Sequence, residues 1–97
     1  TEARASYETA LRLSPNDPSA LVGLGIVEYE AGNFARAAND YYRAMLQQPT
    51  DVGYLLMSRA LNRAGQQAPA QAARAQAEQI SKDLAQAQES ADRLLAP

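Results

Sequence analysis

A chain of 97 residues suits one small domain and leaves little length for a second one. Ala supplies 21 of the residues, which favours helices over sheets, while the absence of His and Cys excludes disulfide frameworks, Cys/His zinc sites and Ser-His-Asp or Cys-His catalysis. The 9 basic and 11 acidic residues leave a net charge of −2, so we expect no nucleic-acid partner.

Capping residues and helix breakers divide the first half of the chain into helices. The first helix is predicted over 2–13. Asp17 as N-cap, followed by Pro18 in the first turn, begins a second helix. This helix ends at Gly32, because glycine readily adopts the left-handed conformation that follows many helices. A third helix, with Asn at its N-cap, is predicted over 33–48.

The second half of the chain is predicted to hold two more helices. Thr50 or the residue after it caps a fourth helix, which ends at Gly65. Pro69 stands near the first turn of a fifth helix. Because neither Pro nor Gly interrupts 70–95, we expect this helix to be unbroken and about 26 residues long. The alternative is a separate short C-terminal helix that is capped by Ser81.

The chain repeats itself at an interval of 34 residues and then of 33 residues. Tyr7 recurs as Tyr41 at the first interval, and Gly32 recurs as Gly65 at the second. A period of this length, with Gly at a turn and Pro near the end, indicates helix–turn–helix repeats that bury their apolar faces against one another.

The central unit carries apolar, small and turn residues in a fixed order: Leu21, Leu24, Gly25, Gly32, Phe34, Ala37, Tyr41, Ala44 and Pro49. This pattern resembles a tetratricopeptide repeat (TPR). In such a repeat, small residues at the positions of Gly25 and Ala37 let the two helices approach closely. Glu28 departs from the pattern, because an aromatic or aliphatic residue usually stands four positions before the turn glycine.

The resemblance extends over most of the chain and implies an all-α fold. We expect antiparallel helix–turn–helix repeats stacked in a short right-handed superhelix, with a long C-terminal helix. In the last repeat, Gln67 and Arg74 replace large apolar residues, as a terminal cap requires. The chain is predicted to form a single TPR-like domain, 1–97, made of the second helix of a partial repeat (1–17), a full repeat (18–50), a degenerate repeat (51–80) and a helical extension or cap (81–97).

The resemblance also implies a binding groove, because the first helices of TPRs line a concave face. Val22, Ile26 and Leu55 are apolar residues that the repeat's own core does not require, and such patches suggest binding. Arg59 and Arg63 lie four positions apart and would present two cations on one face, although both could equally be solubilising charges. The predicted groove residues are Val22, Ile26, Tyr29, Leu55, Arg59, Asn62 and Arg63.

An interaction module or scaffold is the function that the resemblance implies, with a peptide or a helix of another protein bound in this groove. The alternative is a structural module that self-assembles into a homo-oligomer through its open N-terminal end, where Ala3, Tyr7, Ala10 and Leu11 would be partly uncovered. Because residue 1 falls inside the repeat pattern, we expect the chain to be part of a longer array.

Catalytic and cofactor chemistry is not indicated by the sequence. The acidic residues are scattered and suggest no shared pocket, so we predict no enzyme, no cofactor and no metal site. No apolar stretch approaches the roughly 20 residues of a membrane span, so we predict no direct membrane insertion. We expect a soluble protein, of the cytoplasm or the periplasm.

Overall fold

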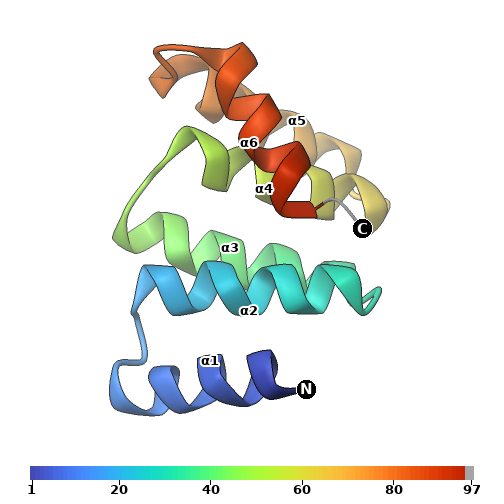
Figure 1. The fold of residues 1–97 in the computed structure, drawn as a ribbon. Coiled ribbons are helices and arrows are strands. Elements are labelled where there is room, and N and C mark those ends of the chain that lie inside the picture. Colours follow the sequence, from blue (N-terminus) through green and yellow to red (C-terminus); the bar gives the residue numbers. More distant parts are fainter. Residues whose placement is uncertain (96–97) are drawn as a thin grey trace.

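The computed structural model describes residues 1–95, which contain six α-helices joined by short connections (Figure 1). In chain order they are α1 (Glu2–Leu13), α2 (Pro18–Glu30), α3 (Phe34–Gln47), α4 (Asp51–Arg63), α5 (Gln67–Ile80) and α6 (Leu84–Leu95). All regular structure in these residues is helical, which confirms the predicted all-α fold class.

Local sequence signals account for the ends of several helices. Asp17 caps α2, because its Oδ1 accepts a hydrogen bond of 3.0 Å from the backbone N–H of Ser19. Thr50, rather than the residue after it, caps α4 with a 3.0 Å hydrogen bond from the backbone N–H three residues later. Gly32 and Gly65 adopt φ angles of +84° and +80° and turn the chain after α2 and α4.

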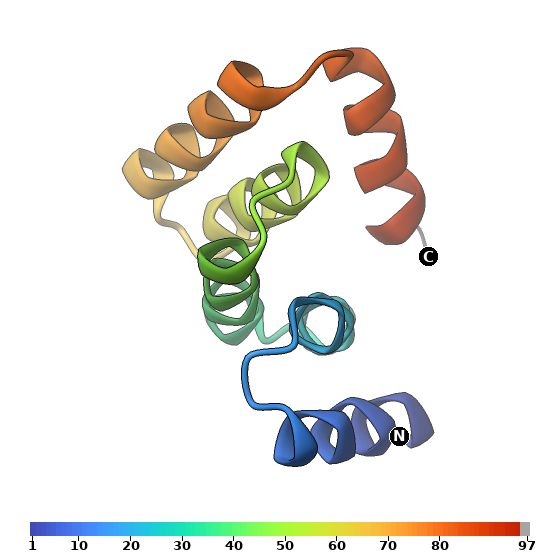
Figure 2. The ribbon, with the colours of Figure 1, turned by 90° about the vertical axis from the view of Figure 1, so that its left-hand side faces the viewer.

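Helices α1 to α5 pack in chain order, each against the helices next to it in sequence. α2 and α3 form one antiparallel pair, α4 and α5 form another, and α3 joins the two pairs by packing on α4 (Figure 1). α1 lies against α2 at the other end of the stack (Figure 2). The stack is therefore built mainly from contacts between helices that are adjacent in the sequence.

The core lies between these helices and combines a few large side chains with many alanines. Its largest fully buried side chains are Tyr41, Leu21, Leu55 and Leu56. Gly25 lies so close to Tyr41 that a Cβ at this position would stand 2.5 Å from the ring Cε1, which confirms its role in close helix approach. The Tyr41 hydroxyl is buried without a hydrogen-bond partner, and burial raises the pKa of this phenol above its ordinary range.

The prediction of one unbroken helix over 70–95 is wrong. α5 ends at Ile80, and the chain leaves the helix at Ser81 with φ and ψ of −77° and 132°. The Ser81 hydroxyl donates a 2.7 Å hydrogen bond to Oδ2 of Asp51 at the start of α4. A serine side chain can compete with helical hydrogen bonds, and here it ties the break to a distant part of the chain.

The alternative of a separate short C-terminal helix is confirmed, although Ser81 does not cap it. Asp83 Oδ1 accepts a 3.1 Å hydrogen bond from the backbone N–H of Gln86, and its carbonyl accepts one of 3.0 Å from the N–H of Ala87. Asp83 therefore acts as the N-cap of α6. The break at 81–83 lets α6 turn back along the molecule instead of extending α5 (Figure 2).

Candidate protein-binding groove

The apolar residues of the predicted groove do come together. Val22, Ile26 and Tyr29 of α2 are half-buried and pack against the same hydrophobic cluster that contains Leu55 of α4. Val22 and Ile26 stand four positions apart and Ile26 and Tyr29 stand three apart, so one face of α2 supplies all three residues. The pattern predicted from the sequence therefore describes a continuous apolar surface across α2 and α4.

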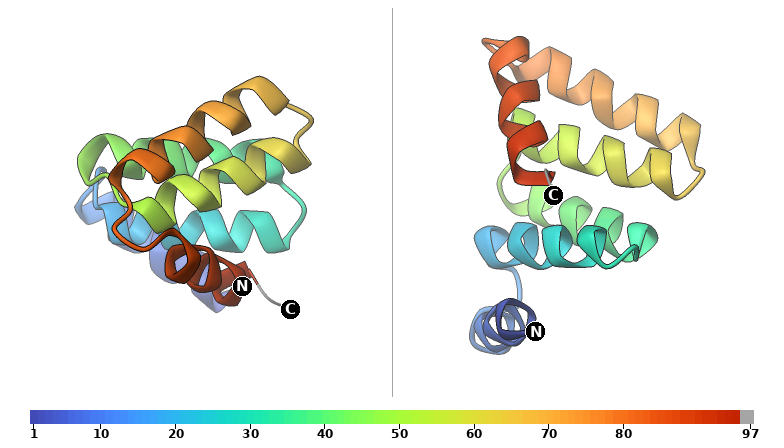
Figure 3. Two further views of the ribbon diagram at one scale, coloured as in Figure 1. Left: turned by 90° about the horizontal axis from the view of Figure 1, so that it is seen from above. Right: turned by 45° about the vertical axis from the view of Figure 1, so that its right-hand side comes forward.

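This surface is not open along its whole length, because α6 lies on it (Figures 1 and 3). Ala87 and Ala91 of α6 are buried in the cluster, and Leu84 and Leu95 pack against it near the two ends of α6. Leu55, predicted as part of an exposed patch, is consequently only 2% exposed. The sequence did not indicate this cover, because α6 was predicted to continue α5.

Arg59 is engaged by α6 rather than free in the groove. Its Nη1 stands 2.5 Å from Oδ1 of Asp92, and its Nη2 donates a 3.4 Å hydrogen bond to the carbonyl of Gln88. The Asp92 side chain is 68% exposed, so this ion pair lies at the rim of the contact and is screened by water. Arg59 is therefore occupied by contacts within the chain.

The end of the groove beyond α6 is open to solvent. Arg63 is exposed, and its guanidinium carbon lies 4.5 Å from the ring centroid of Phe34 and 5.9 Å from that of Tyr29. The two rings meet edge to face, with centroids 5.0 Å apart. Together with Leu95, these residues border a hollow of about 560 Å³ that we name the open end of the groove.

Asn62 is exposed, and no contact of its side chain supports or contradicts a role in binding. Phe34 borders the open end of the groove but was not among the predicted groove residues, since its place in the repeat pattern gave no sign of partial exposure. The residues of α6 were missed because this segment was predicted to continue α5 and not to turn back onto α2 and α4.

Comparison with protein families decides the identity of the fold. A sequence model described as tetratricopeptide repeat matches residues 1–52, which is more than half of the chain. The chain belongs to the tetratricopeptide repeat family. No curated protein and no solved structure matches it.

TPRs are generally protein–protein interaction modules and typically carry no catalytic activity. This family membership makes a protein partner the general expectation for the chain. Among the residues that the structure describes, no helix combines the length and the apolar character needed to cross a bilayer.

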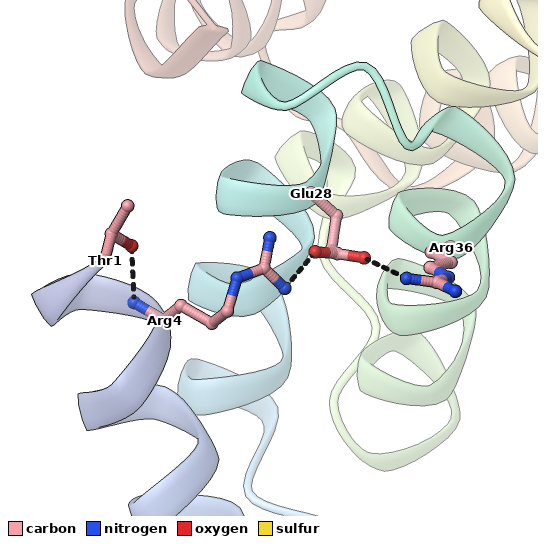
Figure 4. Close-up of polar contacts among 4 residues, drawn as sticks. All are labelled: Thr1, Arg4, Glu28 and Arg36. Atoms are coloured by element: carbon pink, nitrogen blue, oxygen red, sulfur yellow. Dashed lines mark hydrogen bonds and ion pairs between the residues drawn. The ribbon is translucent and has the colours of Figure 1, made fainter.

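Glu28, the departure from the TPR pattern, is buried with ionic partners. Its side chain is 4% exposed, and Oε1 forms an ion pair with Nη1 of Arg4 in α1 (Figure 4). Oε2 lies 4.0 Å from Nη1 of Arg36 in α3. Thr1 caps α1 by accepting a 3.2 Å hydrogen bond from the backbone N–H of Arg4, which helps to fix that residue. An ionic bridge thus takes the place of the apolar contact usual in TPRs.

Asp40 of α3 lies near Glu28 and Arg4, and the pKa of its carboxyl is raised. Burial raises the pKa of its carboxyl to about 6, and the neighbouring charge of Glu28 adds to the effect. Arg43 and Arg4 act in the opposite direction and limit the rise. Because an unfolded chain has the ordinary value of 3.8, the folded protein holds this proton more tightly than the unfolded one.

The stability of the domain should therefore depend on the charge of Asp40. The stabilisation by the bound proton is complete below pH 3.8 and is lost as the pH rises through about 6. Asp40→Asn mimics the neutral carboxyl. We expect this substitution to raise the free energy of unfolding at pH 7 by on the order of 1–2 kcal/mol more than it does at pH 4. Urea unfolding of both chains across this range measures the difference, and a difference independent of pH would contradict the assignment.

A second hollow lies on another face of the TPR stack and was not predicted. It has a volume of about 440 Å³ and lies between α3, α4 and α5. Tyr42 and Leu46, which are exposed, stand on one side, and Pro69 and Ala72 of α5 stand on the other. Its lining is almost entirely apolar, and small residues on α5 leave the space between the two second helices unfilled.

Proposed function

We propose that this TPR chain is an interaction module that binds a helix or a peptide segment of another protein across α2 and α4. The observation that carries the proposal is that the apolar face shared by these helices already accepts a helix, α6, from outside the helix pairs. The proposed groove residues are Val22, Ile26, Tyr29, Leu55, Arg59, Asn62 and Arg63.

The repeat organisation belongs to the same proposal. We assign residues 18–50 to a full repeat, 51–80 to a degenerate repeat and 1–17 to the second helix of a partial one, with 81–97 as a cap. Stacking of these units with a right-handed superhelical turn would make the face of α2 and α4 concave. A concave face surrounds a bound segment and buries more of it than a flat one does.

The open end of the groove supports the proposal by its chemistry. Aromatic and arginine side chains supply much of the binding energy at protein interfaces, because they combine large apolar area with a polar tip. Stacking on Phe34 and Tyr29 holds the guanidinium of Arg63 in place before a partner arrives. Less side-chain entropy is then lost on binding.

Partner capture with a groove variant tests this function. The full chain is used as bait in a lysate of the cells that produce it and should retain a partner protein. The double variant Tyr29→Ala with Arg63→Glu should retain about tenfold less of that protein. Both residues lie at the open end of the groove, so α6 should stay in place, which circular dichroism and unfolding can verify.

Tyr42→Ala with Arg12→Glu is the matched control, since it removes an exposed aromatic ring and reverses an exposed arginine on other faces. Loss of the captured protein with this control, and not with the groove variant, would place the binding site on the faces that carry Tyr42 or Arg12, outside the groove.

Self-association through α1 is the second candidate function. Leu13 is 84% exposed, which leaves an apolar side chain uncovered at the N-terminal end of the stack. Tyr7, Ala10 and Leu11 are half-buried, because α1 packs on α2, whereas Ala3 is exposed. A monomer in sedimentation velocity at every accessible concentration would exclude this candidate.

A further inference from the structure

We propose that α6 is a displaceable internal occupant of the groove, and that the partner is an amphipathic helix with the same chemistry as α6. The contact face of that helix carries two small residues four positions apart, apolar residues near both ends and an acidic residue opposite Arg59. This inference rests on the proposed function, which it deepens by naming the kind of partner and the way in which access to the groove is controlled.

The place of α6 in the fold is the first observation. Each of α2 to α5 packs extensively on the helix before it, as the TPR stack requires. α6 instead packs most extensively on α4 and also on α2, while its packing on α5 is sparser than either. Figure 2 shows α4 between α5 and α6, with α6 on the side of α2. α6 therefore lies where a bound segment would lie, and not where the next helix of the stack would.

The contact face of α6 shows which side chains the groove accepts. Ala87 and Ala91 lie on one face of α6, and both are buried against the groove. Small side chains at these two positions let the helix backbone approach the half-buried Val22 and Ile26 of α2 and the buried Leu55 of α4. A helix with large side chains at both positions would be held away from this surface.

The ion pair with Arg59 favours one direction and register of the bound helix. The carboxylate of Asp92 meets Arg59 at 2.5 Å, one residue after the second buried alanine. A helix bound in the opposite direction would bring a different side chain to Arg59 and leave this cation without its partner. An acidic residue at the position of Asp92 is therefore part of the chemistry that we assign to the partner.

The contact that holds α6 is suited to replacement. Alanine methyl groups bury little apolar area, and the exposed ion pair of Arg59 and Asp92 is screened by water. The connection to α5 is the short segment 81–83, which adopts no helix and can serve as a hinge. A partner helix with larger apolar residues at its two ends than Leu84 and Leu95 would bury more area in the same groove.

Tethering gives α6 an advantage over any free helix. A segment joined by a three-residue connection acts at a high effective concentration. A competing helix can bind only while α6 is undocked, so its apparent affinity falls as α6 spends more time in the groove. The groove of the isolated chain is then mostly closed, and a partner must bind more tightly than α6 to open it.

Undocking α6 in the full-length chain tests the inference. In Ala87→Glu with Ala91→Glu, two carboxylates replace buried methyl groups, so α6 should leave the groove. The probe is a fluorescent peptide of residues 82–95 with blocked ends, added at increasing concentrations of protein. We expect it to bind the undocked chain about tenfold or more tightly than the wild type. The control Ala85→Glu with Gln86→Glu adds the same charge at exposed positions of α6 and should behave as the wild type does.

A charge exchange tests the register. The peptide with Asp92→Arg should bind the undocked chain about tenfold more weakly, and adding Arg59→Glu to that chain should restore binding. No binding of the original peptide to a folded undocked chain overturns the chemistry assigned to the partner. Equal binding to the undocked chain and the wild type overturns the competition by α6. Both results leave the capture experiment with Tyr29 and Arg63 unaffected, so the failure of this inference and that of the proposed function are distinguishable.

Hydrogen exchange of the wild-type chain provides a test that does not depend on the folding of any variant. If α6 undocks, its amides exchange through a partial opening, before those of α2 to α4. Exchange of α6 only on global unfolding overturns the proposal. A wild-type dimer in sedimentation velocity that becomes a monomer in the undocked chain would show that the occupant is α6 of a second copy, and it would overturn the assignment of a separate partner helix.

Discussion

Gly25→Leu is expected to lower the free energy of unfolding by about 3 kcal/mol. A Cβ at this position would stand 2.5 Å from Cε1 and 2.8 Å from Cδ1 of Tyr41, and the remaining atoms of leucine have still less space. Tyr41 is fully buried among neighbouring helices and cannot move aside without opening the core. The α2–α3 pair must therefore separate, and urea unfolding should show a lower midpoint.

The control for this change is Ala35→Leu, which adds the same side chain at an exposed position of α3 and should change stability by no more than about 0.5 kcal/mol. The double variant Gly25→Leu with Tyr41→Ala should lose less than the sum of the two single losses, because each change relieves the strain or fills the space that the other creates. Additive losses, or an unchanged midpoint for Gly25→Leu alone, would rule out the close contact.

Arg4→Met is expected to destabilise the protein by about 2–3 kcal/mol, although Arg4 itself is half-buried near the N-terminus. Its removal leaves the buried carboxylate of Glu28 with Arg36 at 4.0 Å, and that arginine side chain is largely exposed. A buried charge without a close partner is costly, whereas the lost apolar packing of arginine is largely restored by methionine. Urea unfolding at neutral pH measures the loss.

Adding Glu28→Leu to the Arg4→Met chain should recover most of this stability, because an apolar pair then replaces the ionic one. Arg12→Met is the matched control, since the Arg12 side chain is exposed and donates only to Thr9 of its own helix. A loss equal to that of the control would mean that Glu28 does not depend on Arg4.

Local signals explain why the helices of the stack could be predicted from the sequence. The caps at Asp17 and Thr50 and the turns at Gly32 and Gly65 each depend on residues within a few positions. The small–large contact of Gly25 was predictable too, because the repeat pattern places it on the facing surface of two adjacent helices.

The features that escaped prediction depend on contacts between distant residues. The break after α5 contains neither Pro nor Gly, and the hydrogen bond from Ser81 to Asp51 that accompanies it spans 30 positions. Glu28 is buried because Arg4, from the preceding helix, reaches its carboxylate. The apolar residues of the groove were predicted from the resemblance to TPRs, whose first helices line a concave face, but that resemblance could not reveal that α6 covers Leu55 and engages Arg59.

The contact between Arg59 and α6 also has a consequence for the order of events during synthesis. Arg59 bonds to a carbonyl that is 29 positions later in the chain, whereas α2 to α5 find their partners in adjacent helices. A ribosome releases the chain from its N-terminus, and units made of neighbouring helices can fold as they emerge. The apolar face of α2 and α4 can therefore assemble outside the ribosome before α6 emerges. The face is then bare for an interval in each newly synthesised molecule, and a partner helix of the kind proposed would meet it without competition from α6.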